Sequence, residues 1–151
     1  MRKNILQSEV KEELISRIEK LRPDAQKQWG KMNVNQMLRH NSMGIQQAYG
    51  DFTPKRKANW FTKKLMRFFI LHSDMATPKE KADTFMEMNM VELNINPTDF
   101  EGEKKKLMEE IKNFPNRKLS PESVMLGPMS TENWARLQYS HIHHHILQFG
   151  V

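Results

Sequence analysis

An all-α fold is predicted, and the economical architecture is a bundle of four main helices. Apolar residues recur at helical spacing along most of the 151-residue chain, and capping residues mark where the helices start. No Asn-Gly or Asp-Gly turn stands between alternating runs, so no hairpin is predicted. The length matches a single domain over residues 1–151, long enough to bury a sizeable core.

The first two helices have clear boundaries. Apolar residues follow Ser8 at helical spacing, and Pro23 predicts an end near Leu21. Asn33, followed three positions later by Gln36, resembles a capping box. A second helix should therefore run to about Tyr49 and stop at Gly50.

The middle of the chain is harder to assign. Residues 60–71 carry aromatic and basic side chains and predict a short helix, and three tryptophans, Trp29, Trp60 and Trp134, are interpreted as core residues rather than pocket lining. Residues 78–96 lack a clear period and are left as part of a long crossover, where an extended piece fits as well as a helix. The architecture thus includes a long connection that carries a short extra helix.

The last two main helices follow this crossover. Thr98 and Glu101 form a second capping box before a helix that ends ahead of Pro115. A loop over residues 115–128 follows, and Ser130 caps a final helix that runs to about Gln148.

Composition limits the chemistry. The chain has no cysteine, so disulfides, thiolate metal sites and cysteine nucleophiles are excluded, and any metal must be held by histidine or carboxylates. No glycine pattern for nucleotides and no Gly-x-Ser-x-Gly elbow occurs. The N-terminus lacks the apolar run of a secretory signal, so a cytoplasmic location is expected.

The net charge of +6 is concentrated in one segment. Residues 52–73 contain six basic and no acidic residues: Lys55, Arg56, Lys57, Lys63, Lys64 and Arg67. A solvated face is the first interpretation, whereas a funnel for an anionic substrate and a nucleic-acid or membrane-surface patch stay open. Neither a nucleic acid nor a membrane is expected as the main partner.

Histidines carry the chemical signal. Four of the six, His141, His143, His144 and His145, fall within five positions of the last predicted helix. His141 and His145 project from the same side one turn apart, whereas His143 points elsewhere.

A third ligand must come from another element. His40, on the side of the second helix that carries Met37 and Gly44, is the best candidate, and His72 is the other available imidazole. Three imidazoles would leave coordination positions open and suit zinc, nickel or iron(II) better than magnesium or calcium. The alternative is that each histidine is an ordinary buried residue with its own hydrogen-bond acceptor.

Two segments resemble the DinB/YfiT-like superfamily of metalloenzymes. Residues 29–40, WGKMNVNQMLRH, are similar to the entry of its second helix, and residues 133–150, NWARLQYSHIHHHILQFG, are similar to its terminal His-x-x-x-His-x-x-Gln helix. The nearest likeness is to a branch of unknown function with an ending similar to His-Ile-Asp-His-His-Leu-Arg-Gln-Phe-Gly. This chain has His143 where that branch has Asp, which questions any role of that Asp.

The resemblance implies an up-down-down-up four-helix bundle in which His40, His141 and His145 hold a divalent metal, with zinc or nickel expected first and iron as a further option. It also implies either hydrolysis or the transfer of a small thiol to an electrophile, with an unknown small-molecule substrate, and it raises the expectation of a homodimer. A non-catalytic metal- or ligand-binding bundle is the alternative, and a basic nucleic-acid or membrane-surface protein is the third hypothesis. No general base is assigned, since Asp51 and Glu132 lie beyond helix ends.

Overall fold

The computed structural model describes residues 2–55, 59–68, 71 and 88–151, and this part of the chain is mostly helical. The all-α prediction is therefore confirmed, with one minor addition. A two-stranded antiparallel hairpin lies inside the segment 115–128 that was predicted to be a plain loop. In chain order the elements are α1 (Ser8–Glu19), α2 (Val34–Tyr49), α3 (Trp60–Arg67), α4 (Phe100–Asn113), β1 (Glu122–Ser123), β2 (Gly127–Pro128) and α5 (Thr131–Leu147).

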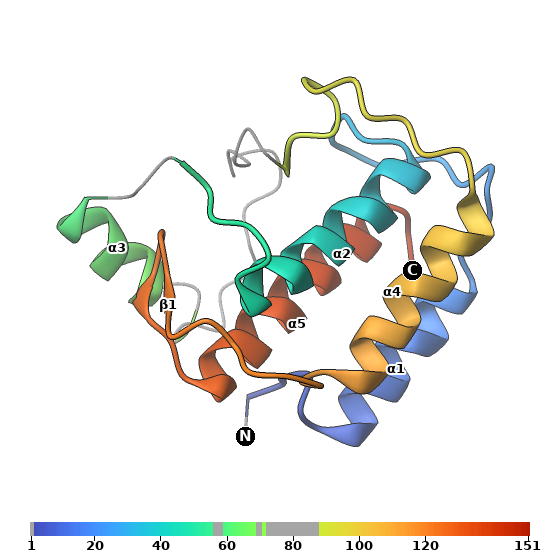
Figure 1. Cartoon of the computed structure of the whole chain (residues 1–151). Coiled ribbons are helices and arrows are strands. Elements are labelled where there is room, and N and C mark those ends of the chain that lie inside the picture. Colours follow the sequence, from blue (N-terminus) through green and yellow to red (C-terminus); the bar gives the residue numbers. More distant parts are fainter. Residues whose placement is uncertain (1, 56–58, 69–70, 72–87) are drawn as a thin grey trace.

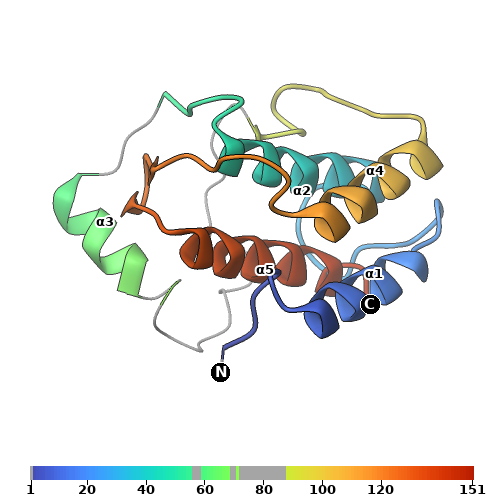
Figure 2. The ribbon, with the colours of Figure 1, turned by 60° about the horizontal axis from the view of Figure 1, so that its bottom comes forward.

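The four long helices form the bundle, and each packs against two others (Figures 1 and 2). Helices α1 and α2 both contact α4 and α5. Lys104 at the start of α4 donates to the carbonyl of Glu19 at the end of α1, so these two helices are antiparallel. Arg39 near the start of α2 reaches Glu103 near the start of α4, which makes that pair parallel.

Helix α5 completes the arrangement. Its Gln138 donates to the carbonyl of Gly44 while its His141 meets His40, so α5 runs antiparallel to α2. The order is therefore up-down-down-up, as the resemblance implies (Figure 1).

Local sequence signals set most helix ends. Asn33 and Gln36 bond each other's backbone N–H reciprocally at 2.9 Å, and Gly50 ends α2 with φ of 79°, a conformation that favours glycine. Ser130 accepts from the backbone N–H of Asn133 as predicted. The N-cap of α4 was predicted at Thr98, and this prediction is wrong because the cap lies one residue later.

The cap of α4 is Asp99, whose carboxylate accepts from the backbone N–H of Gly102 at 2.9 Å. Asp and Thr are both good N-caps, so the local pattern alone could not separate them. The register that starts the helix at Phe100 buries Phe100, Leu107 and Ile111, and this packing decides the boundary.

The core lies between the four long helices, and each of them contributes to it. Trp134 is almost fully buried, and its indole N–H donates to the carbonyl of Ser120 at 2.8 Å. Trp60, in contrast, is 74% exposed, so its interpretation as a core residue is wrong. The reason is that α3 lies outside the bundle, next to the hairpin (Figures 1 and 2).

The crossover between α2 and α4 is only partly described. Helix α3 confirms that it carries a short extra helix, with residues 69–70 of the predicted helix outside the described part. Most of the unassigned segment, residues 78–87, also lies outside it, whereas residues 88–99 form turns and irregular chain. In the described part, none of the helices has the length and apolar character needed to cross a membrane.

Candidate metal centre

His40 is positioned by the apolar stripe of α2. It follows the buried Met37 by about one helical turn, and its own side chain is only 2% exposed. Its Nδ1 lies 3.0 Å from the carbonyl oxygen of Met88, an atom that can only accept a hydrogen bond. The Nδ1 of neutral His40 therefore carries the proton, and Nε2 keeps its lone pair.

His145 has the same protonation pattern through a different partner. Its Nδ1 lies 2.7 Å from Oε1 of Gln148, which stands three residues later at the end of α5. Nδ1 donates to this oxygen, so Nε2 of His145 also keeps its lone pair. This geometry gives a physical role to the His-x-x-Gln spacing.

The three predicted histidines converge on one point. One ligand atom from each of His40, His141 and His145 lies within 4.8 Å of the other two. The ring centroids are 4.6 to 4.8 Å apart in all three pairs. His40 and His145 are buried, whereas His141 is partly exposed as a residue, although its imidazole ring is desolvated.

The shortest contact in the cluster joins Nε2 of His141 to Nε2 of His40 at 2.9 Å. Because Nε2 of His40 has no proton, Nε2 of His141 must donate in this contact. His141 is thus the ligand whose proton has to leave Nε2, or move to Nδ1, before all three Nε2 atoms can face an ion.

Gln138 and Gly44 border His141 on the far side of its ring. A Cβ added at Gly44 would lie 2.7 Å from Nδ1 of His141 and 3.3 Å from Oε1 of Gln138, so both atoms line the space that the missing side chain leaves. Gln138 donates through Nε2 to the carbonyl of Gly44 at 3.0 Å, and its Oε1 is buried without a hydrogen-bond partner. A hydrogen bond from a protonated Nδ1 of His141 to this unpartnered oxygen would fit a metal-binding tautomer.

Burial keeps the cluster neutral. Desolvation lowers the pKa of His40 from 6.5 to about 4 and that of His145 to about 3. The pKa of His141 falls well below 6.5 for the same reason, with the neighbouring imidazoles adding to the effect. At neutral pH all three rings therefore have the uncharged form that binds metal.

The other histidines have different surroundings. His143 points away from the cluster, as predicted, and the structure places it against α1, where its Nδ1 accepts from the Arg17 guanidinium at 2.8 Å. An Asp at this position of this chain would face the same guanidinium rather than the cluster. His144 packs its ring edge against Trp29 and His145, and His72 lies outside the described residues.

In the described part of the chain, no carboxylate joins the three imidazoles. Asp51 lies beyond the end of α2, as predicted, and forms an ion pair with Arg117. Glu132 was predicted to lie beyond a helix end, but it stands in the first turn of α5 and pairs with Arg136 one turn along the helix. Neither acid is therefore available as a general base at the cluster.

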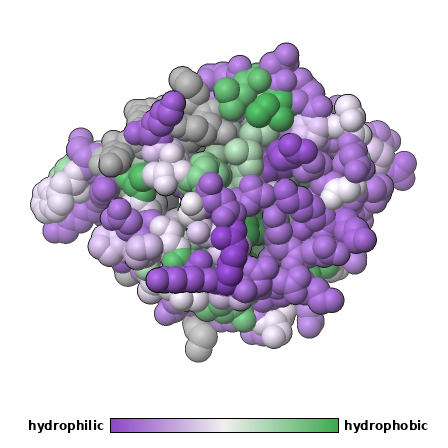
Figure 3. Space-filling model, viewed as in Figure 1, coloured by the Kyte–Doolittle hydropathy of each residue, from purple (hydrophilic) through white to green (hydrophobic). Residues whose placement is uncertain are grey.

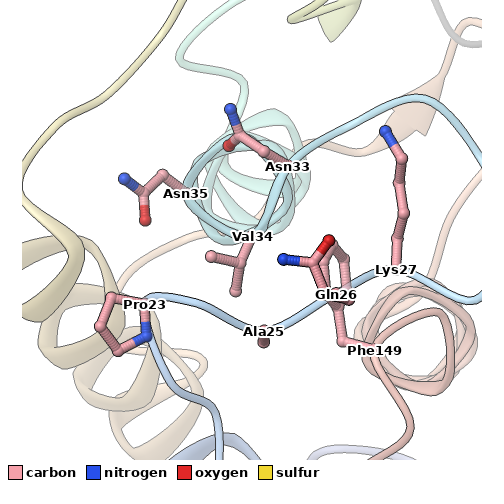
Figure 4. Close-up of a pocket in the computed structure, with 8 residues that line it drawn as sticks. All are labelled: Pro23, Ala25, Gln26, Lys27, Asn33, Val34, Asn35 and Phe149. Atoms are coloured by element: carbon pink, nitrogen blue, oxygen red, sulfur yellow. The ribbon is translucent and has the colours of Figure 1, made fainter.

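A separate cavity of about 280 Å³ lies where the α1–α2 connection, the start of α2 and the segment after α5 meet (Figure 4). Its lining combines apolar residues such as Val34 and Phe149 with amide side chains. None of the three clustered histidines lines it, so this cavity is not the approach to the cluster.

Sequence reasoning missed three contributors to the site. The carbonyl of Met88 comes from the unassigned crossover, where no pattern could place it next to His40. Gly44 and Gln138 do have a signal, because Gly44 follows His40 by four residues and Gln138 precedes His141 by three. Each spacing puts the residue next to a ligand on the same helix side.

Fold and site together define a helical bundle with a buried three-histidine cluster that could hold a metal. Residues 1–150 match the model of the family described as "Protein of unknown function (DUF1569)", and the chain belongs to this family. No curated protein and no solved structure matches the chain.

Proposed function

We propose that this protein is a metal-dependent enzyme in which His40, His141 and His145 hold one divalent ion that activates water or a small thiol. The observation that carries the proposal is the convergence of three neutral imidazoles, two of which have Nδ1 committed to an acceptor outside the cluster. Ordinary buried histidines satisfy their nitrogens separately. Here the contacts leave Nε2 atoms directed at one another.

The ligand set leaves room for chemistry. Structural zinc sites are closed by four protein ligands, whereas catalytic sites keep a position open. A divalent ion bound by three imidazoles supplies Lewis acidity and lowers the pKa of a water or thiol that occupies the open position. The wider resemblance to DinB/YfiT-like proteins supports hydrolysis or thiol transfer as the reaction class.

The residues of the chain then have distinct roles. Met88 and Gln148 orient His40 and His145 through their Nδ1 protons, and Gln138 is suited to do the same for His141. A small molecule would approach from the side of His141, which is the least buried of the three residues. No carboxylate of the described residues joins the cluster, so no general base is assigned.

The ligand chemistry favours zinc or nickel, with iron(II) as a further option. Neutral imidazoles without thiolates suit all three ions. Magnesium and calcium prefer oxygen ligands and are disfavoured.

The test uses full-length protein without a histidine tag, since a tag would bind metal by itself. Elemental analysis after purification, and titration of the metal-free protein with zinc, nickel and iron(II), should give about one ion per chain. The loaded protein is then assayed with thiols plus electrophiles and with esters and amides. Metal-dependent turnover in one of these two panels would support the corresponding reaction.

Two results would contradict the proposal. A protein that binds no divalent ion would remove the metal centre altogether. A protein that binds one ion at the three histidines but is inactive in both panels would favour the non-catalytic binding bundle.

A further inference from the structure

Helix α3 presents its apolar side to solvent. Trp60 is 74%, Phe61 68% and Leu65 48% exposed, whereas none of the eight residues of this helix is buried. At about 100° per residue, these three side chains lie within an arc of about 140°. A helix that only covered the bundle would turn this arc inward.

The opposite side of α3 is attached to the protein. Met66, on the side of α3 away from the arc, packs against the core. Arg67, beside the Trp60 edge of the arc, donates through its guanidinium to the carbonyls of Leu126 and Pro128 in and beside the hairpin. These contacts fix the direction of the helix. The apolar arc therefore faces outward because the other side is held, with Asn59 capping its start through the backbone N–H of Thr62.

Basic side chains surround the apolar arc. Lys64 lies within it and places its ammonium group 5.3 Å from the centre of the Trp60 ring, and Lys63 flanks it. No acidic residue occurs in the sequence from residue 52 to residue 73. A partner that binds this surface must therefore offer both apolar groups and negative charge.

This requirement separates the candidates. A second copy of α3 would bring lysines against lysines with no acid from the segment to compensate. A nucleic acid matches the charge and could stack on aromatic rings, but it offers no apolar partner for Leu65. An anionic lipid surface meets both requirements, since aromatic and leucine side chains enter the headgroup boundary while lysines pair with lipid phosphates.

We propose that α3 is a docking surface for anionic membranes, with Trp60, Phe61 and Leu65 entering the interface and Lys63 and Lys64 contacting acidic headgroups. The surface lies on the element that is separate from the four-helix group (Figures 1 and 2). It does not depend on the histidine cluster. The two proposals can therefore fail separately.

A second exposed apolar spot provides the control. Figure 3 shows a face covered mostly by hydrophilic residues, with hydrophobic atoms gathered at the top of the view, over the segment that leads into α4. Val91 and Leu93 are exposed in this segment, at 39% and 43%. Acidic Glu92 stands between them, so this spot lacks the positive charge of α3.

The experiment is sedimentation of full-length protein with phosphatidylcholine vesicles that do or do not contain phosphatidylglycerol. Binding is expected only with phosphatidylglycerol, and it should fall about tenfold or more in Lys63→Glu/Lys64→Glu and in Trp60→Ser/Phe61→Ser. Lys105→Glu/Lys106→Glu changes the charge equally on an exposed part of α4, and Val91→Ser/Leu93→Ser removes a similar apolar spot. Both control variants should bind like the unchanged protein.

Insertion has its own readout. Tryptophan fluorescence should be quenched by brominated lipid in the unchanged protein and much less in Trp60→Phe, since Trp134 is buried in the core and Trp29 packs against His144 of α5. Equal losses in the α3 and control variants would overturn the proposal, because they would indicate general charge attraction. Vesicle-independent dimerisation or binding to single-stranded RNA that α3 variants abolish, without binding to vesicles, would overturn it in favour of those partners.

Discussion

Helix α2 buries polar side chains toward both of its neighbours, but the two sides use them differently. Toward α4, Arg39 donates through Nε to both carboxylate oxygens of Glu103 at 2.9 and 3.0 Å, so the two groups satisfy each other. Toward α5, His40 uses Nδ1 for a carbonyl outside the cluster, while its Nε2 meets Nε2 of His141 and its ring packs against that of His145. The first side is a structural contact, whereas the second is arranged like a binding site.

Among the variants that test the two sides of α2, His40→Ala should have the largest effect, a loss of metal affinity. Structural zinc sites gain about 10–16 kcal/mol from their ligands together, so losing one of three ligands should weaken metal binding by roughly a thousandfold or more. Competition with a chromophoric chelator measures the change, and helical circular dichroism confirms that the bundle persists. Unchanged affinity would place the metal elsewhere and reduce the α5 side of α2 to ordinary packing.

Gly44→Ala tests whether the close approach of α2 and α5 matters to the site. The new Cβ would lie 2.7 Å from Nδ1 and 2.9 Å from Cε1 of His141, so the ring has to move. Metal affinity should fall roughly tenfold to hundredfold, the range seen when ligand orientation is disturbed. Ser42→Ala, at a buried α2 position two residues earlier, is the control and should leave affinity unchanged.

Gln138→Leu asks whether the buried oxygen of Gln138 orients His141. The variant keeps most of the volume but removes the acceptor, and metal affinity should fall about tenfold. Gln138→Glu retains an acceptor and should keep affinity closer to that of the unchanged protein. If Leu and Glu variants bind metal equally well, Gln138 only packs against Gly44.

Arg39→Met examines the structural side of α2. It leaves the Glu103 carboxylate, which is nearly buried, without its partner, and Arg39 itself is partly exposed. Because that exposure screens the pair, the free energy of unfolding should fall by about 1–2 kcal/mol, measured by urea denaturation. Metal affinity per folded molecule should not change, and a parallel loss of metal would show that the two sides of α2 are coupled.

A feature on either side of α2 could be predicted when its sequence signal lies within a single helix. The boundaries of α2, the stripe that buries His40 and the one-turn spacing of His141 and His145 all lie within single helices, and each was predicted. That three imidazoles share one point also required the resemblance to a known family, because helix periodicity says which side a residue faces but not which helix it meets.

What could not be predicted depends on long-range contacts. Met88 reaches His40 from 48 residues away, through a crossover that has no clear period. The outward direction of α3 depends on Arg67 meeting carbonyls of a hairpin about 60 residues later. The apolar content of the segment indicated that Trp60 is buried. Trp60 is exposed because α3 is attached to the hairpin, which the sequence pattern does not reveal.

The smallest expected effect concerns Glu110, again on the α4 side of α2. Burial raises the pKa of its carboxyl group above 4.5, and hydrogen bonding to Ser42 and Gln46, the latter at 3.4 Å, offsets this only in part. The pKa of Glu110 is higher in the folded state than in the unfolded state, so at pH values between the two the folded state binds more protons. The free energy of unfolding therefore falls as pH rises through this range. Glu110→Gln removes the charge and should raise the Tm at neutral pH by a few degrees at most.

The gain from Glu110→Gln should disappear below pH 4.5, where the carboxyl group is protonated in both states. The histidines on the α5 side predict the opposite trend. Their folded-state pKa values lie below 6.5, so the unfolded state binds more protons as pH falls from 6.5 toward 4, and the metal-free protein loses stability there. Thermal unfolding of the metal-free unchanged protein and of Glu110→Gln, followed from pH 4 to 8, should therefore separate the two sides of α2 by the sign of their pH dependence. A Glu110→Gln gain that is the same at every pH would mean that packing rather than charge sets the effect on the α4 side.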